Sequence, residues 1–302
     1  MRDEQAGLPA PAVEFCYRHP NIQTGVHCTR CGRPICPDCM IQAPVGHQCP
    51  ECVGRARREF REGPGLKLRR GAASATRILL AGLFAVFVLE VAVGGSEALL
   101  GRNTLHLNQN LYDLGALFPP AVADGQYWRL LSAMFLHAGL VHIAFNAYAL
   151  WLFGNVVEQI FGSARFLLIF FVSGLLASVI SYAFGPLWDL GVGASGAIFG
   201  VFGAFVAYNY RRRHLAMAAA NLRTAVMLIV VNAALAFAIP RIDWRAHLGG
   251  LVAGIAAGYV AEGFGPARQR AVIRVVGFGA LIALGVALVV WRTDQIRSML
   301  GL

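Results

Sequence analysis

The sequence predicts an all-α polytopic membrane protein with a small cysteine-rich domain at its N-terminus. Charged residues make up 14% of the 302 residues, against about 25% in soluble domains. Apolar residues make up 57%, and the mean hydropathy is +0.57. These values exclude a soluble globule, a disordered chain and a fibrous repeat, and they indicate several membrane-spanning helices. All seven cysteines lie within the first 52 residues, so their chemistry belongs to one N-terminal unit.

Four pairs of potential metal ligands follow one another in this unit, and two residues separate the members of each pair. The pairs are Cys16 with His19, Cys28 with Cys31, Cys36 with Cys39, and Cys49 with Cys52. This spacing lets one tight turn direct two ligands at one ion, and two such turns complete a tetrahedral zinc site. Eight ligands therefore suffice for two zinc ions. Because each site would have four protein ligands and no open position, the metal is expected to be structural.

The order of the ligands resembles that of B-box-type zinc fingers. We assign one zinc ion to Cys16, His19, Cys36 and Cys39, and the other to Cys28, Cys31, Cys49 and Cys52. His47 is an alternative ligand in place of Cys49 or Cys52, whereas His27 is expected to be a bystander. A disulfide cluster is the competing interpretation. The odd number of cysteines, their paired spacing and the expected lack of a preceding signal peptide favour zinc.

A basic segment follows the cysteines and identifies the cytoplasmic side. Eight basic and two acidic residues lie between Arg55 and Arg77. We interpret residues 55–76 as a juxtamembrane linker and place a zinc-binding domain of residues 1–54 in the cytoplasm. The net charge of +10 then reflects topology, and no nucleic-acid partner is expected. Lys67 is the only lysine among 26 basic residues, a bias that we read as a hint of a GC-rich bacterial genome.

Seven apolar segments come next, and we predict a transmembrane helix for each within a membrane domain of residues 77–292. The helices are expected at about 78–95, 133–156, 166–185, 194–210, 224–240, 246–262 and 273–291. Seven spans from a cytoplasmic N-terminus leave residues 293–302 as a short extracytoplasmic tail. The loops 211–223 and 268–274 fall on the cytoplasmic side and are basic, as the positive-inside rule requires.

The first extracytoplasmic loop, from about Ser96 to Arg129, is too apolar for a simple solvated loop. It contains the stretch Leu111 to Leu117 and two consecutive prolines. We expect it to lie partly in the membrane interface, anchored by Tyr127 and Trp128.

Polar residues inside apolar segments are costly in hydrocarbon and usually mark function. The second segment carries His142 and Asn146, which are four residues apart and share a helix face. Ser195 opens the fourth segment and His247 opens the sixth. The predicted topology gives these three segments the same direction, so their polar groups lie at one depth near the extracytoplasmic side. A hydroxyl, an imidazole and hydrogen-bond donors are the groups that acyl transfer requires.

Each of these residues alone has an ordinary explanation, because a serine in a membrane helix usually serves packing and a histidine at a helix end is usually interfacial. The hydrolase motif Gly-x-Ser-x-Gly does not apply, since residue 197 is Ala. Glycines spaced four residues apart occur on both helices, namely Gly196 and Gly200, and Gly250, Gly254 and Gly258. Such small residues provide structural support by letting helices approach closely. A Ser–His hydrogen bond needs this approach, although ordinary membrane packing would produce the same glycines.

Taken together, these residues resemble the rhomboid family of intramembrane serine proteases. The matching motifs are Trp128-Arg129, Phe135-Leu136-His137 with His142 and Asn146, Gly193-Ala194-Ser195-Gly196, and Ala246-His247-Leu248-Gly249-Gly250-Leu251. The resemblance covers about residues 78–292 and includes the order of the motifs and their placement on helices. It implies a six-helix core plus one extra C-terminal transmembrane helix.

The resemblance also implies roles for individual residues. Ser195 would be the nucleophile and His247 the general base, a dyad without a third carboxylate. His142 and Asn146, with the backbone N–H of Ser195, would form the oxyanion hole. Structural roles are implied for Trp128, Arg129, His137 and Glu158. Phe199 stands where the family often has a tyrosine packed on the catalytic histidine, and its ring is expected to keep that packing.

The sequence therefore predicts an intramembrane serine endopeptidase whose substrates are transmembrane proteins and whose chemistry needs no cofactor. We expect a multi-pass protein of the cell membrane with its active site opening to the extracytoplasmic side. An alternative is a catalytically silent scaffold whose zinc-binding domain recruits a cytosolic protein partner. A transporter is a third alternative. It is disfavoured because the polar residues lie away from the bilayer midplane and no inverted repeat is visible.

Overall fold

The computed structural model describes residues 13–43, 45–62, 74–101, 111–238 and 242–301. The chain divides into two compact units, Met1–Ala73 and Ser74–Leu302, which we describe separately. Of the predicted linker 55–76, residues 63–73 lie outside the described residues.

The N-terminal unit is made of short elements. They are a 3₁₀ turn η1 (Pro37–Cys39), strands β1 (Ile41–Gln42) and β2 (His47–Gln48), and helix α1 (Pro50–Glu62). The two strands pair in antiparallel fashion. Ile35 is fully buried, and the other members of its buried cluster are six of the seven cysteines. So little apolar surface cannot stabilise a unit of this size, which therefore depends on cross-links or metal ions.

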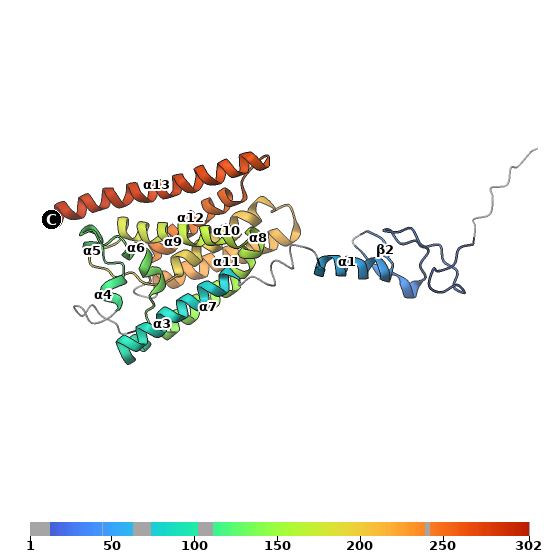
Figure 1. Ribbon diagram of the computed structural model, residues 1–302, viewed down its shortest axis with the longest axis horizontal. Helices are drawn as coiled ribbons and strands as arrows, with labels where there is room; N and C mark the ends of the chain where they lie inside the picture. Colours follow the sequence, from blue (N-terminus) through green and yellow to red (C-terminus); the bar gives the residue numbers. More distant parts are fainter. Residues whose placement is uncertain (1–12, 44, 63–73, 102–110, 239–241, 302) are drawn as a thin grey trace, which may run out of the picture. The chain divides into compact units, whose positions relative to one another are not determined.

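The second unit is built from helices, and Figure 1 shows their arrangement. Six long ones are α3 (Ala75–Leu100), α9 (Ser163–Phe184), α10 (Ser195–Arg211), α11 (Ala216–Ala238), α12 (Trp244–Glu262) and α13 (Ala267–Leu300). A seventh runs continuously through α7 (Leu140–Ala149), the π-helical turn η3 (Leu150–Gly154) and α8 (Asn155–Phe161). Four short helices lie between α3 and α7: α4 (Leu111–Gly115), α5 (Pro119–Ala123), α6 (Arg129–Ser132) and the 3₁₀ turn η2 (Ala133–Phe135).

These helices confirm the predicted all-α polytopic membrane fold. Within the described residues, α3, the α7–α8 helix, α9, α11 and α13 are long and apolar enough to cross a membrane by length and composition. Helix α10 has only 17 residues, and α12 carries Arg245 and His247 in its first turn. Both coincide with predicted spans, but they are less apolar because they carry the glycines and polar groups of the interior.

The second predicted span differs from the observed helix at its start. We expected a helix from residue 133, whereas the continuous helix begins at Leu140. The backbone of Gly139 has φ 90°, a conformation that non-glycine residues rarely adopt, and it interrupts the chain between η2 and α7. His137 therefore precedes the helix instead of lying within it.

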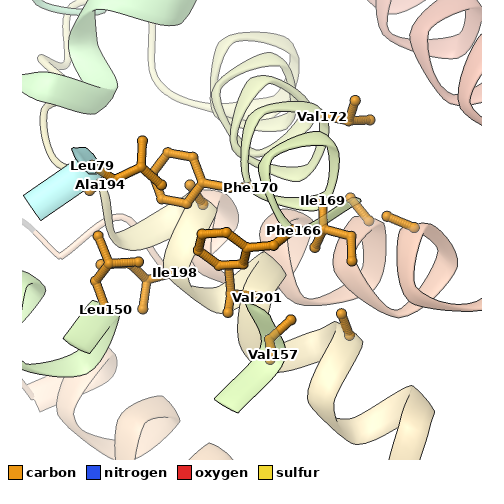
Figure 2. Packing of buried hydrophobic residues seen from close by; sticks show 14 of the residues in the cluster. Leu79, Leu150, Val157, Phe166, Ile169, Phe170, Val172, Ala194, Ile198 and Val201 are labelled. Atoms are coloured by element: carbon orange, nitrogen blue, oxygen red, sulfur yellow. The ribbon is translucent and has the colours of Figure 1, made fainter. Parts of the chain in front are cut away.

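Helix α9 contributes several of the large buried side chains at the centre of the unit. Phe166, Ile169 and Phe170 are fully buried. Figure 2 shows Phe166 and Phe170 among side chains of α3, η3, α8 and α10, including Leu79, Leu150, Val157, Ile198 and Val201. The buried core thus joins the middle and the C-terminal part of the α7–α8 helix to α10, whose first turn carries Ser195.

Helices α10 and α12 approach backbone to backbone, as the glycine pattern predicts. A Cβ atom built on Gly250 would overlap the carbonyl oxygen of Gly196, and one built on Gly254 would overlap that of Gly200. Gly200 is equally restricted by Ser173 of α9. No side chain larger than hydrogen fits at these positions without moving a helix.

Glu158 fastens the end of α8 to the start of α3. Its carboxylate accepts hydrogen bonds from the hydroxyls of Ser74 (2.6 Å), Thr76 (2.7 Å) and Ser163 (2.6 Å). It also accepts from the backbone N–H groups of Ala75 (2.8 Å) and Thr76 (3.0 Å). These N–H groups are among those that a helix start leaves unpaired. Five donors compensate the desolvation of this buried charge.

Gly254→Ala should destabilise the membrane unit, because the added methyl group must push α10 and α12 apart. We expect a loss of about 1–3 kcal/mol, measured by thermal unfolding of the purified protein in detergent. Gly279→Ala in α13 is the matched control, since a Cβ atom there meets nothing within 4 Å. Equal unfolding temperatures for the two variants would contradict the packing argument.

Candidate active site

Ser195 is the first residue of α10 and is held there by a glycine loop. Gly193, two residues earlier, has φ 119°, and its N–H donates to the carbonyl of Ala133 (2.8 Å). Gly191 and Leu117 exchange two backbone hydrogen bonds of 2.9 Å. The loop before the serine is therefore fastened to the α4–η2 region at two points.

His247 lies in the first turn of α12 and contacts Ser195. Its Nε2 atom is 2.9 Å from the Ser195 Oγ atom. The ring of Phe199 stacks on the imidazole with 4.4 Å between centroids and 12° between planes, so the expected packing is present without a hydroxyl. No hydrogen-bond partner of His247 Nδ1 occurs among the described residues. The geometry is that of a two-residue Ser–His pair.

Asp243 stabilises the first turn of α12, which carries His247, but makes no hydrogen bond with the Nδ1 atom of the His247 ring. Its carboxylate accepts from the N–H groups of Arg245 (3.0 Å) and Ala246 (3.2 Å) and so caps the start of α12. Ser181 of α9 also donates to it. Asp directly before a helical segment is a recognisable N-cap signal in a sequence, and it could have identified this residue.

His142 and Asn146 face the same loop from α7. The N–H of Ala138 donates to His142 Nδ1 (3.1 Å), so the neutral ring carries its proton on Nε2. A Cβ atom built on Gly193 would lie 2.8 Å from His142 Nε2 and 3.6 Å from Asn146 Nδ2. Both side-chain donors therefore face the backbone two residues before Ser195.

The amide of Asn146 is a buried donor without an acceptor. The residue is 5% exposed, and its Nδ2 atom has no hydrogen-bond partner among the described residues. Such groups are rare because they are costly, and they call for an explanation. The N–H of Ser195, at the start of α10, is likewise among those that a helix leaves without an internal acceptor. The Ser195–His247 pair and three potential donors thus lie around the Gly193–Ser195 segment, an arrangement that could stabilise an oxyanion.

Trp128 and Arg129, for which structural roles are expected, donate hydrogen bonds to backbone carbonyl groups. Arg129 is 6% exposed and donates to the carbonyl oxygens of Ala116 (2.9 Å) and Asp113. The Nε1–H group of Trp128 donates to the carbonyl oxygen of Leu114 (3.0 Å). Both residues thereby hold α4 against α6. The depth at which Tyr127 and Trp128 meet the membrane stays a prediction.

Glu90 is a residue of α3 whose role sequence reasoning missed. It is 2% exposed, and its two carboxylate oxygens accept from the backbone N–H of His137 at 3.1 and 3.2 Å. His137 is fully buried, and its ring lies edge-on to His142 with centroids 5.3 Å apart. An acid within an apolar segment was the available signal.

The N-terminal unit brings its eight potential ligands together in two groups. Cys16, His19, Cys36 and Cys39 form one, and Cys28, Cys31, Cys49 and Cys52 form the other. Within each group the ligand atoms lie within 4.8 Å of one another, and no two of the seven cysteines form a disulfide. The groups match the predicted assignment. They could hold two metal ions.

The distances fit a tetrahedral site. Zn–S and Zn–N bonds of about 2.3 and 2.0 Å separate ligand atoms by roughly 3.5–3.8 Å. His19 Nδ1 lies 3.2, 3.5 and 3.8 Å from the sulfur atoms of Cys36, Cys39 and Cys16. In the second group, the sulfur atoms of Cys31 and Cys49 are 3.8 Å apart.

The alternative ligand His47 and the expected bystander His27 both lie outside the two groups. His47 belongs to β2, and His27 contacts Glu14.

The thiols of the second ligand group differ in pKa. The pKa of Cys31 falls to about 6, chiefly because Arg33 donates a hydrogen bond to its sulfur atom. A hydrogen bond with Cys49 is the chief reason that the pKa of Cys52 rises to about 12. Proton sharing of this kind is expected of thiols held close enough to bind one cation.

Comparison with known proteins places the similarity in the membrane unit. Residues 124–263 match the family described as Rhomboid domain. Rhomboid protease GluP of Bacillus subtilis (strain 168) is 40% identical over 170 residues, which cover 56% of this chain and 31% of that protein. The putative rhomboid protease YdcA of the same organism is 34% identical over 172 residues, covering 57% of this chain and 81% of that protein.

A plant protein shows a similar degree of identity. RHOMBOID-like protein 5 of Arabidopsis thaliana is 37% identical over 157 residues, which cover 50% of this chain and 49% of that protein. The matched region thus covers less than half of the length of two of these relatives, namely 31% of the first and 49% of the plant protein.

Proposed function

This chain belongs to the rhomboid family, and from that membership and the site geometry we propose that it is an intramembrane serine endopeptidase. It would cleave transmembrane segments of other membrane proteins near their extracytoplasmic ends. The observation that carries the proposal is the 2.9 Å contact between His247 Nε2 and Ser195 Oγ, next to the unpaired amide of Asn146. Two of the relatives are named rhomboid proteases, which supports protease chemistry at the level of the family.

The proposed reaction is an acyl transfer in two steps. Ser195 Oγ attacks the scissile carbonyl carbon while His247 Nε2 takes its proton. The negative oxygen of the tetrahedral intermediate accepts hydrogen bonds from Asn146 Nδ2, His142 Nε2 and the Ser195 N–H. His247 then gives its proton to the leaving amine. In the second step His247 takes a proton from water, which attacks the acyl-enzyme, and then returns that proton to Ser195 Oγ as the acyl–oxygen bond breaks and the free acid leaves.

The topology supports cleavage near the extracytoplasmic end of a substrate helix. Ser195 and His247 lie at the starts of α10 and α12, and the basic loop that joins α10 to α11 lies at the opposite end of α10. By the positive-inside rule that loop is cytoplasmic, so the proposed site opens to the other side of the cell membrane. An unwound substrate backbone is tolerated at this depth only inside such a polar site.

Ser195→Ala should abolish cleavage, because it removes the nucleophile. We would measure cleavage of a reporter transmembrane segment by the purified protein in detergent or proteoliposomes. A fluorophosphonate probe, which reacts with activated serines, should label the wild-type protein and leave Ser195→Ala unlabelled. Ser96→Ala in α3, where the serine is exposed, should leave both signals unchanged. A wild-type protein that neither cleaves nor reacts with the probe would instead support the silent scaffold.

Asn146→Ala should weaken catalysis without abolishing it. Loss of one oxyanion donor costs on the order of 10²–10³ in kcat, while KM should change little because the donor acts mainly in the transition state. Asn155→Ala is the matched control, since that amide bonds only to Trp151 of its own helix among the described residues. Comparable kcat values for the two variants would argue against an oxyanion role of Asn146.

We further propose that the N-terminal unit is a cytoplasmic, B-box-like domain that binds two structural Zn²⁺ ions. The donor set of soft sulfur and imidazole ligands suits zinc. Metal binding would hold together a unit whose apolar core is too small to fold alone. Its function would be to engage a cytosolic protein partner, and the proposed proteolysis itself needs no metal.

Cys28→Ser should lower the zinc content of the purified protein from about two ions per chain toward one, because tetrahedral sites with a missing ligand bind weakly. Metal content is measured by a colorimetric assay after denaturation. His47→Asn should keep two ions, since its ring lies outside both ligand groups. A loss of zinc in His47→Asn would revive its role as a ligand.

A further inference from the structure

The last turns of α13 extend beyond what a membrane span needs. Its 34 residues form a helix of about 51 Å, whereas the hydrocarbon core is about 30 Å thick. The uncharged part of the helix lies between Arg274 and Arg292. Residues after Arg292 therefore continue past the apolar part on the side where the candidate active site lies.

These last turns hold half of the buried residues of α13. Four described residues of the helix are buried, namely Phe278, Gly285, Thr293 and Ile296, and most of the helix surface is exposed. Ile296 is fully buried in a cluster with Val122 and Ala123 of α5 and with Leu130. Figure 1 shows the C-terminal end of α13 beside α5. The terminal turns are thus packed onto the loop region between α3 and α7.

Polar contacts hold the same end of α13 against two neighbours, namely α5 and the C-terminal end of α9. The hydroxyls of Thr293 and Tyr182 of α9 are 2.8 Å apart and buried. Arg297 Nε donates to the carbonyl of Ala123 (2.8 Å). Arg292 donates to the carbonyl of Gly185 (3.4 Å), just after α9. A helix that served only as a membrane anchor would not need this set of contacts outside the apolar part.

The cluster around Ile296 continues to the loop that carries Ser195. Leu117 and Ala133 belong to the same buried cluster. Leu117 exchanges two backbone hydrogen bonds with Gly191, and the carbonyl of Ala133 accepts from the N–H of Gly193. Gly193 in turn faces His142 and Asn146. An unbroken series of packed and hydrogen-bonded groups therefore runs from the end of α13 to the proposed oxyanion hole.

We propose that the terminal turns of α13 are a positioning element for the candidate active site. Thr293, Ile296 and Arg297 hold α5 and the end of α9, and these hold the Gly191–Gly193 loop in the register that aligns the oxyanion donors with Ser195. The effect on catalysis rests on the proposed function, whereas the effect on the order of the loop does not.

The first test measures loop order directly, by amide hydrogen exchange of the full chain in detergent. Thr293→Val keeps the volume of the side chain but leaves the buried Tyr182 hydroxyl unpaired, and Ile296→Ala removes the central side chain of the cluster. Both should raise exchange several-fold in peptides that contain Leu117, Gly191 and Gly193. Met299→Ala is the control on the same helix, because Met299 is 63% exposed. Unchanged exchange in these peptides for both variants would overturn the proposal whether or not the protein cleaves anything.

The second test separates positioning from global stability. In a reporter-cleavage assay Thr293→Val should lower kcat on the order of tenfold, short of the roughly 10²-fold that a 1 Å misplacement costs, while KM stays unchanged. Thr293→Ser restores the hydroxyl and should restore kcat. Cleavage by the wild-type protein with equal kcat in Thr293→Val would overturn the catalytic part of the inference. Cleavage that persists in Ser195→Ala would overturn the proposed function instead, and leave the exchange result standing.

Discussion

The backbone-to-backbone contact between α10 and α12 is the interaction on which the candidate active site depends. Ser195 and His247 are 52 residues apart in the chain and lie in the first turns of the two helices. Their side chains meet because Gly250 and Gly254 have no Cβ atoms to keep the helices apart. In hydrocarbon, where water exclusion does not drive helices together, such van der Waals contact is the main source of association. The fold and the site are therefore specified by the same glycines.

Buried polar groups in the membrane unit differ in how completely they are hydrogen-bonded. Glu158 and Arg129 have several partners each, as groups that only stabilise the fold should. Asn146 Nδ2 and His247 Nδ1 lack partners among the described residues, and so does Nε2 of His137, for which a structural role is expected. An unpaired buried donor costs stability, so its retention at a site that also contains a Ser–His contact favours a functional explanation. Protein stability and proposed catalysis thus make opposite demands on residues of the same membrane unit.

The sequence predicted the parts of the structure that depend on local pattern. Each of the seven long helices that the described residues form overlaps an apolar segment of the sequence, and the spacing of cysteines gave the two ligand groups in the observed order. The start of α7 at Leu140 was not predicted, because it depends on the backbone of Gly139 and not on hydrophobicity. The role of Glu90 was missed for a similar reason. Its partner is a backbone N–H 47 residues away, and no side-chain pattern reveals such a contact.

The position of α13 shows why a residue's distance from the reacting atoms does not measure its influence on the site. Hydrophobicity placed this helix in the membrane but could not say what its last turns touch, since Arg292 and Arg297 interrupt the apolar pattern there. Those turns meet α5 and the end of α9, and both elements border the loop before Ser195. Because packed interiors transmit displacement and do not absorb it, a shift of this additional C-terminal helix would reach the Gly191–Gly193 loop through α5 and the end of α9, as the proposed positioning role requires. The extra helix is therefore better understood as part of the site's support than as an appendage.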